Sequence, residues 1–143
     1  MGEYHHNVDQ KGRLIIPSKL RNDLTETVIV TRGLENCLFI YSQNEWQKII
    51  KKLNTLPFTK KDARNFIRMF ISGATECEFD KQGRIKLSNP LIDFAEITKE
   101  CVVLGVSDRL EVWAKEKWNN FFTSNQDSFS DLADNLFDYG IDE

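Results

Sequence analysis

The chain has 143 residues, which is the length of one ordinary domain or of two small domains packed together. Hydrophobic residues account for 41% of it and charged residues for 29%, a composition that excludes an intrinsically disordered protein and indicates a soluble globular one. The net charge of −3 is unevenly spread, because residues 124–143 carry six acidic side chains and no Lys or Arg, so that an acidic tail follows a body with a net charge of +3.

The first half of the chain predicts four short strands, because runs of apolar and β-branched residues are separated by turn residues. These strands are residues 3–8, 13–16, 28–31 and 38–41. Pro17 suits the first turn of a short helix that runs to about Leu24, because the fixed φ of proline is already helical.

Two helices are predicted between the halves. We expect Asn44 to cap the first and Thr59 to cap the second, with the break at Pro57. Each helix has an apolar stripe at helical spacing, formed by Trp46, Ile49, Ile50 and Leu53 in the first and by Ala63, Phe66, Ile67 and Phe70 in the second. These helices would connect the two halves.

The second half repeats the plan of the first. Strands are predicted at residues 75–79, 84–87, 101–106 and 110–113, followed by a helix that holds Trp118, Phe121 and Phe122. In the acidic tail, Phe129, Leu132, Ala133 and Leu136 again fall at helical spacing, so we expect the tail to fold onto something. The predicted division is 5–47 for the first repeat, 48–75 for a helical connector, 76–119 for the second repeat and 120–143 for the acidic helical tail.

One short motif occurs twice and indicates a duplication. Asp9, Gly12 and Arg13 are followed 71 positions later by Asp80, Gly83 and Arg84, each time with a two-residue spacer after the Asp. With one extra residue allowed in the second copy, Gly33 aligns with Gly105, the strand at 38–41 with the strand at 110–113, and Trp46 with Trp118. In each motif we expect Asp to bond its own backbone and Gly to supply the positive φ of a tight hairpin.

The basic residues of the motif leave two interpretations open. Arg13 and Arg84 could pair with the carboxylates and pack along the sheet, or they could contact phosphates and guanine, for which arginine is well suited. Lys11 and Lys81 lie within the two spacers, and Lys86 adds a charge to the second copy. The second candidate for phosphate contact is the basic run on the connecting helices, Lys48, Lys51, Lys52, Lys60, Lys61, Arg64 and Arg68, which is also typical of a solvated helix face.

No catalytic or metal site is indicated. His5 and His6 are the only histidines, and neighbours in a strand point to opposite faces, so the two would not share a metal ion. Cys37, Cys77 and Cys101 are odd in number and widely spaced, which favours free thiols in a reducing cytoplasm. We expect the aromatic side chains, namely Trp46, Trp113, Trp118, Phe66, Phe70, Phe121 and Phe122, to lie in the core rather than to stack on bases.

The doubled Asp-x-x-Gly-Arg motif resembles the MraZ family of bacterial regulators. The run R-L-I-I-P-S-K-L-R at 13–21 and the run P-F-T-K-K-D-A-R between the halves carry the resemblance further, so that it covers nearly the whole chain. The second copy departs from the first after the motif, with Ile92 where the first has Arg21, so the second half matches the family pattern less well as a site of DNA contact.

The resemblance implies an α+β, mainly β fold: a tandem AbrB-like double-split, swapped-hairpin β-barrel with connecting and C-terminal helices. It implies a cytoplasmic, nucleoid-associated homo-oligomer, a closed ring that binds tandem repeats in double-stranded DNA upstream of the division and cell-wall gene cluster and usually represses it. No enzyme activity, cofactor, small-molecule substrate or membrane partner is implied. The residues carried over are Lys11, Arg13, Lys81 and Arg84 facing DNA, with Asp9, Gly12, Asp80 and Gly83 holding their loops. Two alternatives are a ring-forming protein-interaction scaffold and an AbrB-type antitoxin.

Overall fold

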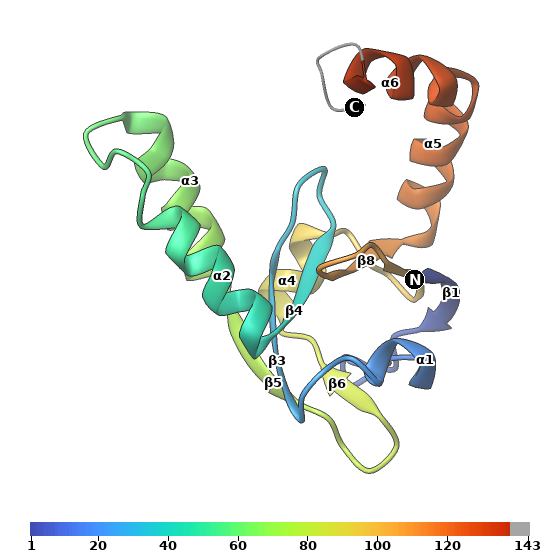
Figure 1. Ribbon diagram of the computed structural model, residues 1–143. Coiled ribbons are helices and arrows are strands. Elements are labelled where there is room, and N and C mark those ends of the chain that lie inside the picture. The colour runs from blue at the N-terminus through green and yellow to red at the C-terminus, as the bar shows by residue number, and fades with distance from the viewer. Residues whose placement is uncertain (138–143) are drawn as a thin grey trace.

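The computed structural model describes residues 1–137 and contains eight strands and six α-helices in that range (Figure 1). The strands are β1 (Gly2–Asn7), β2 (Arg13–Ile15), β3 (Thr27–Arg32), β4 (Leu38–Ser42), β5 (Thr75–Glu78), β6 (Arg84–Lys86), β7 (Glu100–Gly105) and β8 (Leu110–Ala114). The helices are α1 (Ser18–Arg21), α2 (Gln43–Leu53), α3 (Lys61–Ser72), α4 (Asn89–Phe94), α5 (Lys115–Asn125) and α6 (Phe129–Leu136), with a 3₁₀ turn at Gln126–Ser128 before the last. The chain is therefore α+β and mainly antiparallel β, which confirms the predicted fold class.

The strands of the two halves are interleaved. The larger sheet has the order β1-β7-β8-β4-β3-β5, and β2 pairs with β6 in a two-stranded ribbon. The first strand of each half therefore pairs with the other half, since β1 lies against β7 and β5 against β3. This exchange is the swapped arrangement that the resemblance implied.

The strand registers reveal a pseudo-twofold axis between the halves. In the β4–β8 pair the central partners are Phe39 and Glu111, and in the β2–β6 pair they are Leu14 and Ile85. Each central pair joins positions that correspond to each other in the two copies of the repeat. A duplicated chain has thus folded as two copies facing each other.

The same registers correct one detail of the predicted alignment. The pair of His6 with Cys101 corresponds to the pair of Cys77 with Val28. Cys101 is therefore the counterpart of Val28 in the second copy, and Gly105 is the counterpart of Arg32. Gly33 then corresponds to Val106, because the N–H of Gly33 closes its turn on Cys37 O at 2.7 Å and that of Val106 closes on Arg109 O at 3.0 Å. The predicted match of Gly33 with Gly105 was wrong by one residue, since the second turn is one residue shorter.

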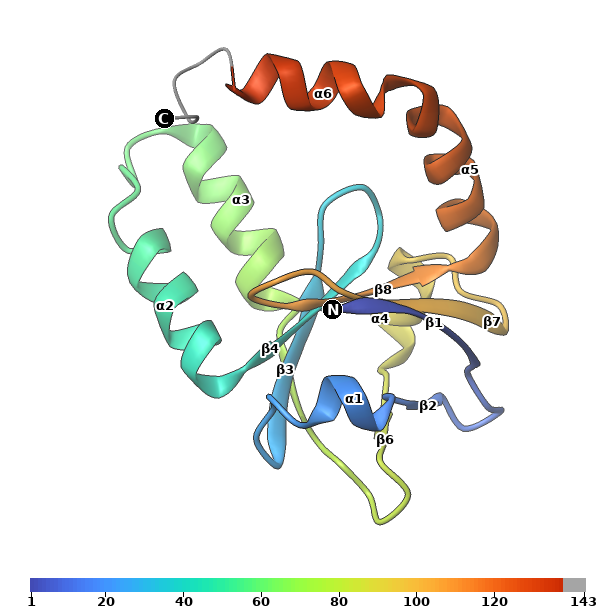
Figure 2. The same cartoon turned by 45° about the vertical axis from the view of Figure 1, so that its right-hand side comes forward.

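Both faces of the larger sheet are covered, and the side chains alternate between two clusters as a strand period of two requires. One cluster lies between the sheet and the β2–β6 ribbon, and its largest fully buried members are Leu14, Ile16, Val28, Val30, Leu38, Ile40, Ile85, Leu87, Leu91, Val103 and Val112. The other lies under α2, α3 and α5 and holds Phe39, Tyr41, Phe70, Val102, Leu104 and Trp113, with Trp46 and Trp118 packed against them. The ribbon and the helical arms thus occupy opposite ends of the molecule (Figures 1 and 2).

Two predicted helix caps are wrong. The N-cap of α2 is Ser42, whose hydroxyl accepts the N–H of Glu45 at 3.2 Å, so that Asn44 lies inside the helix. The N-cap of α3 is Lys60 rather than Thr59, and it makes no side-chain cap. Ser and Asn are nearly equal as N-caps, so the sequence alone could not distinguish Ser42 from Asn44. In the structure, β4 ends at Ser42 and α2 begins at the next residue.

The aromatic and tail predictions are confirmed only in part. Trp113 and Phe70 are buried, but Phe66 is 39% exposed and Phe122 is 51% exposed, so these two do not belong to the core. The tail does form a helix, α6, yet Phe129 on that helix is 75% exposed, and no residue of α6 belongs to either buried cluster of the described chain. The predicted tail residues Asp138, Asp142 and Glu143 lie outside the described residues. Within residues 1–137, no helix has the length and apolar character that a bilayer crossing requires.

Leu14→Ala tests the role of the ribbon in holding the halves together. Leu14 is fully buried among residues of both halves, so the variant should lose about 2–5 kcal/mol of unfolding free energy through lost transfer energy and the cavity left behind. Urea denaturation followed by circular dichroism measures this loss. Ile15→Ala is the matched control on the same strand, since Ile15 is 40% exposed, and it should change the free energy of unfolding little. Equal losses in the two variants would contradict the assignment of the ribbon to the core.

Candidate nucleic-acid interface

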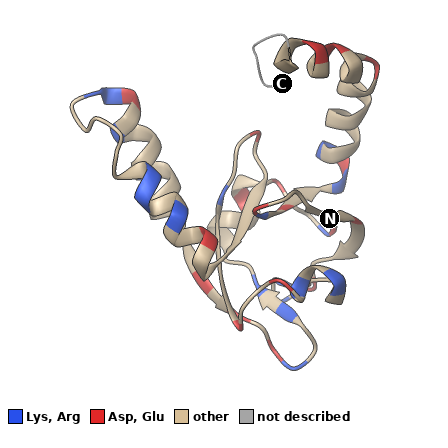
Figure 3. Ribbon diagram, viewed as in Figure 1, with Lys and Arg blue, Asp and Glu red and all other residues tan. Residues whose placement is uncertain are grey.

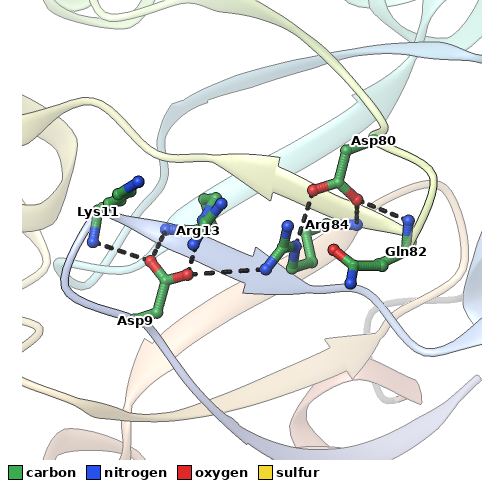
Figure 4. Close-up of polar contacts among 6 residues, drawn as sticks. All are labelled: Asp9, Lys11, Arg13, Asp80, Gln82 and Arg84. Carbon is green, nitrogen blue, oxygen red and sulfur yellow. Dashed lines mark hydrogen bonds and ion pairs between the residues drawn. The ribbon is translucent and has the colours of Figure 1, made fainter.

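The loop before β2 is built on the carboxylate of Asp9. Its Oδ1 accepts the backbone N–H groups of Lys11 and Arg13 at 2.9 Å each, and its Oδ2 accepts the Nε–H of Arg13 at 2.6 Å (Figure 4). Gly12 has a φ of 81° and donates its N–H to Asp9 O at 3.0 Å, which closes the turn. A Cβ makes that backbone conformation unfavourable, so glycine is strongly favoured there.

The loop before β6 repeats this geometry atom for atom. Asp80 Oδ1 accepts the backbone N–H groups of Gln82 and Arg84 at 2.9 Å each, and Oδ2 accepts the Nε–H of Arg84 at 2.7 Å. Gly83 has a φ of 76°. The structural half of the sequence interpretation is therefore confirmed for both Asp and both Gly residues: each aspartate holds its own loop.

Each loop is bonded to the other half of the chain through its glycine. The carbonyl oxygen of Gly12 accepts the N–H of Leu87 at 2.8 Å, and the carbonyl oxygen of Gly83 accepts the N–H of Ile16 at 3.0 Å. Each loop is thus bonded to the strand end of the other half. Because β2 and β6 are antiparallel, the loops stand at opposite ends of one ribbon.

The outer face of the ribbon brings the motif arginines together. Leu14 and Ile85 point inward, so their neighbours Arg13, Ile15, Arg84 and Lys86 lie on the outside. Arg13 pairs with Lys86, and Ile15 pairs with Arg84, in the antiparallel register. The Nη1 of Arg84 also lies 3.9 Å from Asp9 Oδ2, which links the two motifs across the ribbon.

Lys86 is a member of this face that the motif alignment alone did not assign to it. The alternation of side chains along β6 places it on the same side as Arg84, and that period of two was readable from the sequence. We call the outer side chains of the ribbon together with its two loop lysines the basic ribbon face, and it consists of Lys11, Arg13, Ile15, Lys81, Arg84 and Lys86.

The basic ribbon face keeps a positive charge after its internal ion pairs are counted. Residues 9–16 and 80–87 contain five basic and two acidic side chains, a net charge of +3. Lys11 and Lys81 are exposed at the loops. Figure 3 shows blue Lys and Arg residues gathered on the ribbon, its lower loop and α1, at the end of the molecule away from α6.

The pseudo-symmetry is broken beside the glycines. The guanidinium of Arg21 on α1 lies over Gly83, where an added Cβ would collide with it, whereas Ile92 occupies the corresponding place near Gly12. The Nε of Arg21 is buried and has no hydrogen-bond partner among the described residues. Near Gly12 the surface instead has a hollow of about 700 Å³, lined in part by Lys11, Lys86 and Asn89.

The chemistry available elsewhere is limited. The three cysteines are free, as predicted, and they are also buried; burial raises the pKa of Cys37 and that of Cys101 to about 12, so these thiols are poor nucleophiles. No cluster of three or more His, Cys, Asp or Glu residues suited to a metal ion occurs within residues 1–137.

The chain matches the family described as "MraZ protein, putative antitoxin-like" twice, over residues 1–69 and again over residues 70–139. It belongs to the MraZ family. The double match also supports the duplication, because each copy contains one Asp-x-x-Gly-Arg loop. MraZ proteins are regulators of the AbrB-like type, so membership makes the chain a regulator-type protein. The division of this MraZ chain at residues 47, 75 and 119 stays a prediction.

The loop aspartates predict a change of stability at acid pH. The hydrogen bond from the N–H of Arg13 lowers the pKa of Asp9, against a smaller opposing effect of desolvation, and the N–H of Arg84 does the same for Asp80. A carboxyl whose pKa is lower in the folded chain stabilises the fold above its unfolded pKa, near 4, and that contribution disappears as the pH falls through the folded value.

Asp9→Asn/Asp80→Asn should therefore flatten the dependence of stability on pH below about pH 4, because Asn cannot gain a proton in that range. Midpoints of urea unfolding between pH 2 and pH 7 measure the effect. Asp93→Asn, which removes a negative charge from α4, controls for the change in net charge. A double variant with the same acid slope as the wild type would mean that the loop carboxylates do not contribute.

Proposed function

We propose that this protein is a sequence-specific DNA-binding transcriptional regulator, acting as a repressor of the division and cell-wall gene cluster. In this proposal a ring of identical subunits binds tandem repeats upstream of its own operon, in the cytoplasm and in association with the nucleoid. The observation that carries the proposal is the basic ribbon face, in which half-buried arginines from both motifs share the outer surface of one ribbon. Family membership supports the regulator class.

A two-stranded β-ribbon has the size of a major-groove ligand, since that groove admits either an α-helix or such a ribbon. Arg13 and Arg84 are each held through Nε by an aspartate, which restricts the rotamers of the arginine before any ligand arrives. Less side-chain entropy is then lost on binding, which favours affinity and a defined register on the DNA. The ion pair and the DNA contact are therefore compatible roles for the same arginine.

Assembly explains how an acidic chain could bind a polyanion. The whole chain carries −3 while the ribbon segments carry +3, so the favourable charge is local. One ribbon offers few phosphate contacts, and each contributes modestly and weakens with salt. A ring that presents several ribbons to several tandem sites gains affinity through effective concentration, on the order of 10²–10⁴ when the geometry allows simultaneous contact.

Lys11→Ala/Lys81→Ala tests phosphate contact without disturbing the loops, because neither lysine side chain contributes to the loop hydrogen bonds described above. Affinity for DNA from upstream of the gene should fall, and the plot of log K against log salt should become shallower by roughly 0.9 for every phosphate that a lysine no longer neutralises. Fluorescence anisotropy at several salt concentrations measures both. Lys115→Ala, a lysine of the α5 arm paired with Glu100, is the control. An unchanged salt slope in the double variant would favour a protein-interaction scaffold instead.

Arg13→Ala should weaken binding to the upstream DNA by about tenfold or more, as expected for the loss of one bidentate arginine contact to a base. Fold and assembly should persist, because the ion pair between Arg13 and Asp9 is about one-third exposed and such pairs contribute little to stability. A mobility-shift assay, circular dichroism and native mass test these statements together. Unfolding or loss of assembly in the variant would show that Arg13 is a purely structural residue.

A further inference from the structure

Two helical arms of opposite charge extend from the sheet. One arm consists of α2, α3 and the loop between them, and residues 43–72 in it contain seven basic and two acidic side chains, a net charge of +5. The other consists of α5 and α6, and residues 115–137 in it contain four acidic and two basic side chains, a net charge of −2, with both lysines in the first turn of α5. Figure 3 shows this contrast, with blue residues along the α2–α3 arm and red residues around α6.

The acidic arm has an apolar surface that nothing covers within residues 1–137. Its helices enclose a groove of about 520 Å³, lined by Phe121, Phe122, Asn125, Gln126, Phe129 and Leu132. Leu136 continues the same stripe and is 59% exposed, so the surface extends along α6. No residue of α6 belongs to either buried cluster of the described chain.

The basic arm has exposed apolar side chains of its own. Phe58 in the loop is 76% exposed and Met69 on α3 is 58% exposed, and Phe66 lies on the same helix. Lys61, Arg64 and Arg68 are spaced i, i+3, i+7 and form a basic stripe along the same helix. Each arm thus has exposed apolar side chains next to charged ones. The charged side chains are mainly basic on the α2–α3 arm and mainly acidic on the α5–α6 arm.

Within one subunit the two arms do not meet. Figure 1 shows them standing apart, with α2 and α3 at the left of the molecule and α5 and α6 at the right. Exposed apolar patches rimmed by charged residues are typical of interaction sites, and complementary charge selects the partner and its orientation. The complementary surface for each arm is present on the other arm of another copy of this chain.

We propose that the α5–α6 arm of one subunit docks on the α2–α3 arm of the next. The contact joins two different surfaces, so it is heterologous, and repetition of a heterologous contact closes a ring when the rotation between subunits allows closure. This inference rests on the ring of the proposed function and identifies the surfaces that would hold it together. The ribbon lies at the opposite end of the molecule from the arms and would remain free for DNA (Figure 2).

The experiment uses two full-length variants, each with one altered surface. Phe129→Ser/Leu132→Ser changes the acidic arm, and Met69→Asp changes the basic arm, all at exposed positions where the fold should tolerate them. We expect the wild type to have the native mass of a multimer and each variant alone to have the mass of a monomer with an unchanged circular dichroism spectrum. Asn135→Ala, on the polar side of α6, is the matched control and should keep the mass of the wild type.

Mixing the two variants in equal amounts is the decisive measurement. Each retains the surface that is altered in the other, so a mixture should form dimers through the single intact contact, whereas neither variant alone should dimerise. Wild-type mass in the Phe129→Ser/Leu132→Ser variant would overturn the docking. Two monomeric variants that fail to pair on mixing would overturn it as well, and so would a monomeric wild type, in which the tail could cover its own α2–α3 arm.

DNA binding is measured separately, so that failure of the docking and failure of the proposed function can be told apart. If the wild type binds the upstream DNA and the Phe129→Ser/Leu132→Ser variant remains a multimer, only the docking fails. If the wild type is a multimer that shows no salt-dependent DNA binding, the proposed function fails. If the docking and the proposed function are both correct, the monomeric variants should bind tandem sites more weakly than the wild type, by a factor on the order of 10²–10⁴.

Discussion

The pairing of β2 with β6 is the constraint on which the rest of the structure depends. Each half supplies one strand of this ribbon, and the carbonyl groups of Gly12 and Gly83 each accept an N–H group from the other half. Leu14 and Ile85, the central pair, fill the space between the ribbon and the larger sheet. One half of the chain alone would bury too little surface to fold securely. The exchange of strands therefore makes the two copies one folding unit.

The same pairing determines what the outer face can present. Side chains alternate between the two faces of a strand. Because Leu14 and Ile85 point inward, Arg13, Arg84 and Lys86 lie on the outer face. Their mutual repulsion is offset by Asp9 and Asp80, which also close the loops. One carboxylate therefore does two things: it terminates a turn by accepting backbone N–H groups, and it orients an arginine. The structural interpretation of the motif arginines rests on Nε, which an aspartate holds in each loop, and the proposed DNA contact would use the other guanidinium nitrogens.

The sequence predicted the features that local chemistry specifies. The Asp-x-x-Gly-Arg loops, the eight strands and the duplication could all be inferred, because turn residues and apolar alternation are local signals. What it could not supply depends on distant contacts. The turn after β7 is one residue shorter than the turn after β3. This difference, and the correspondence of Arg32 with Gly105, are visible only in the strand register and the turn hydrogen bonds. Helical periodicity placed Phe66 and Phe122 on apolar stripes. Periodicity does not show whether the surface that packs against such a stripe belongs to the same chain or to another chain.

Duplication followed by divergence gives these exposed stripes a common origin. Trp46 on α2 and Trp118 on α5 occupy corresponding places, each packed under the sheet, so the two helices began as equivalent elements. The first is now followed by α3, with a net charge of +2, and the second by α6, with a net charge of −2. Two identical arms could pair only with their own kind, in a contact that closes after two subunits. Arms of opposite charge repel their own kind and attract each other, which favours a head-to-tail contact and leaves every subunit with one surface of each kind to offer.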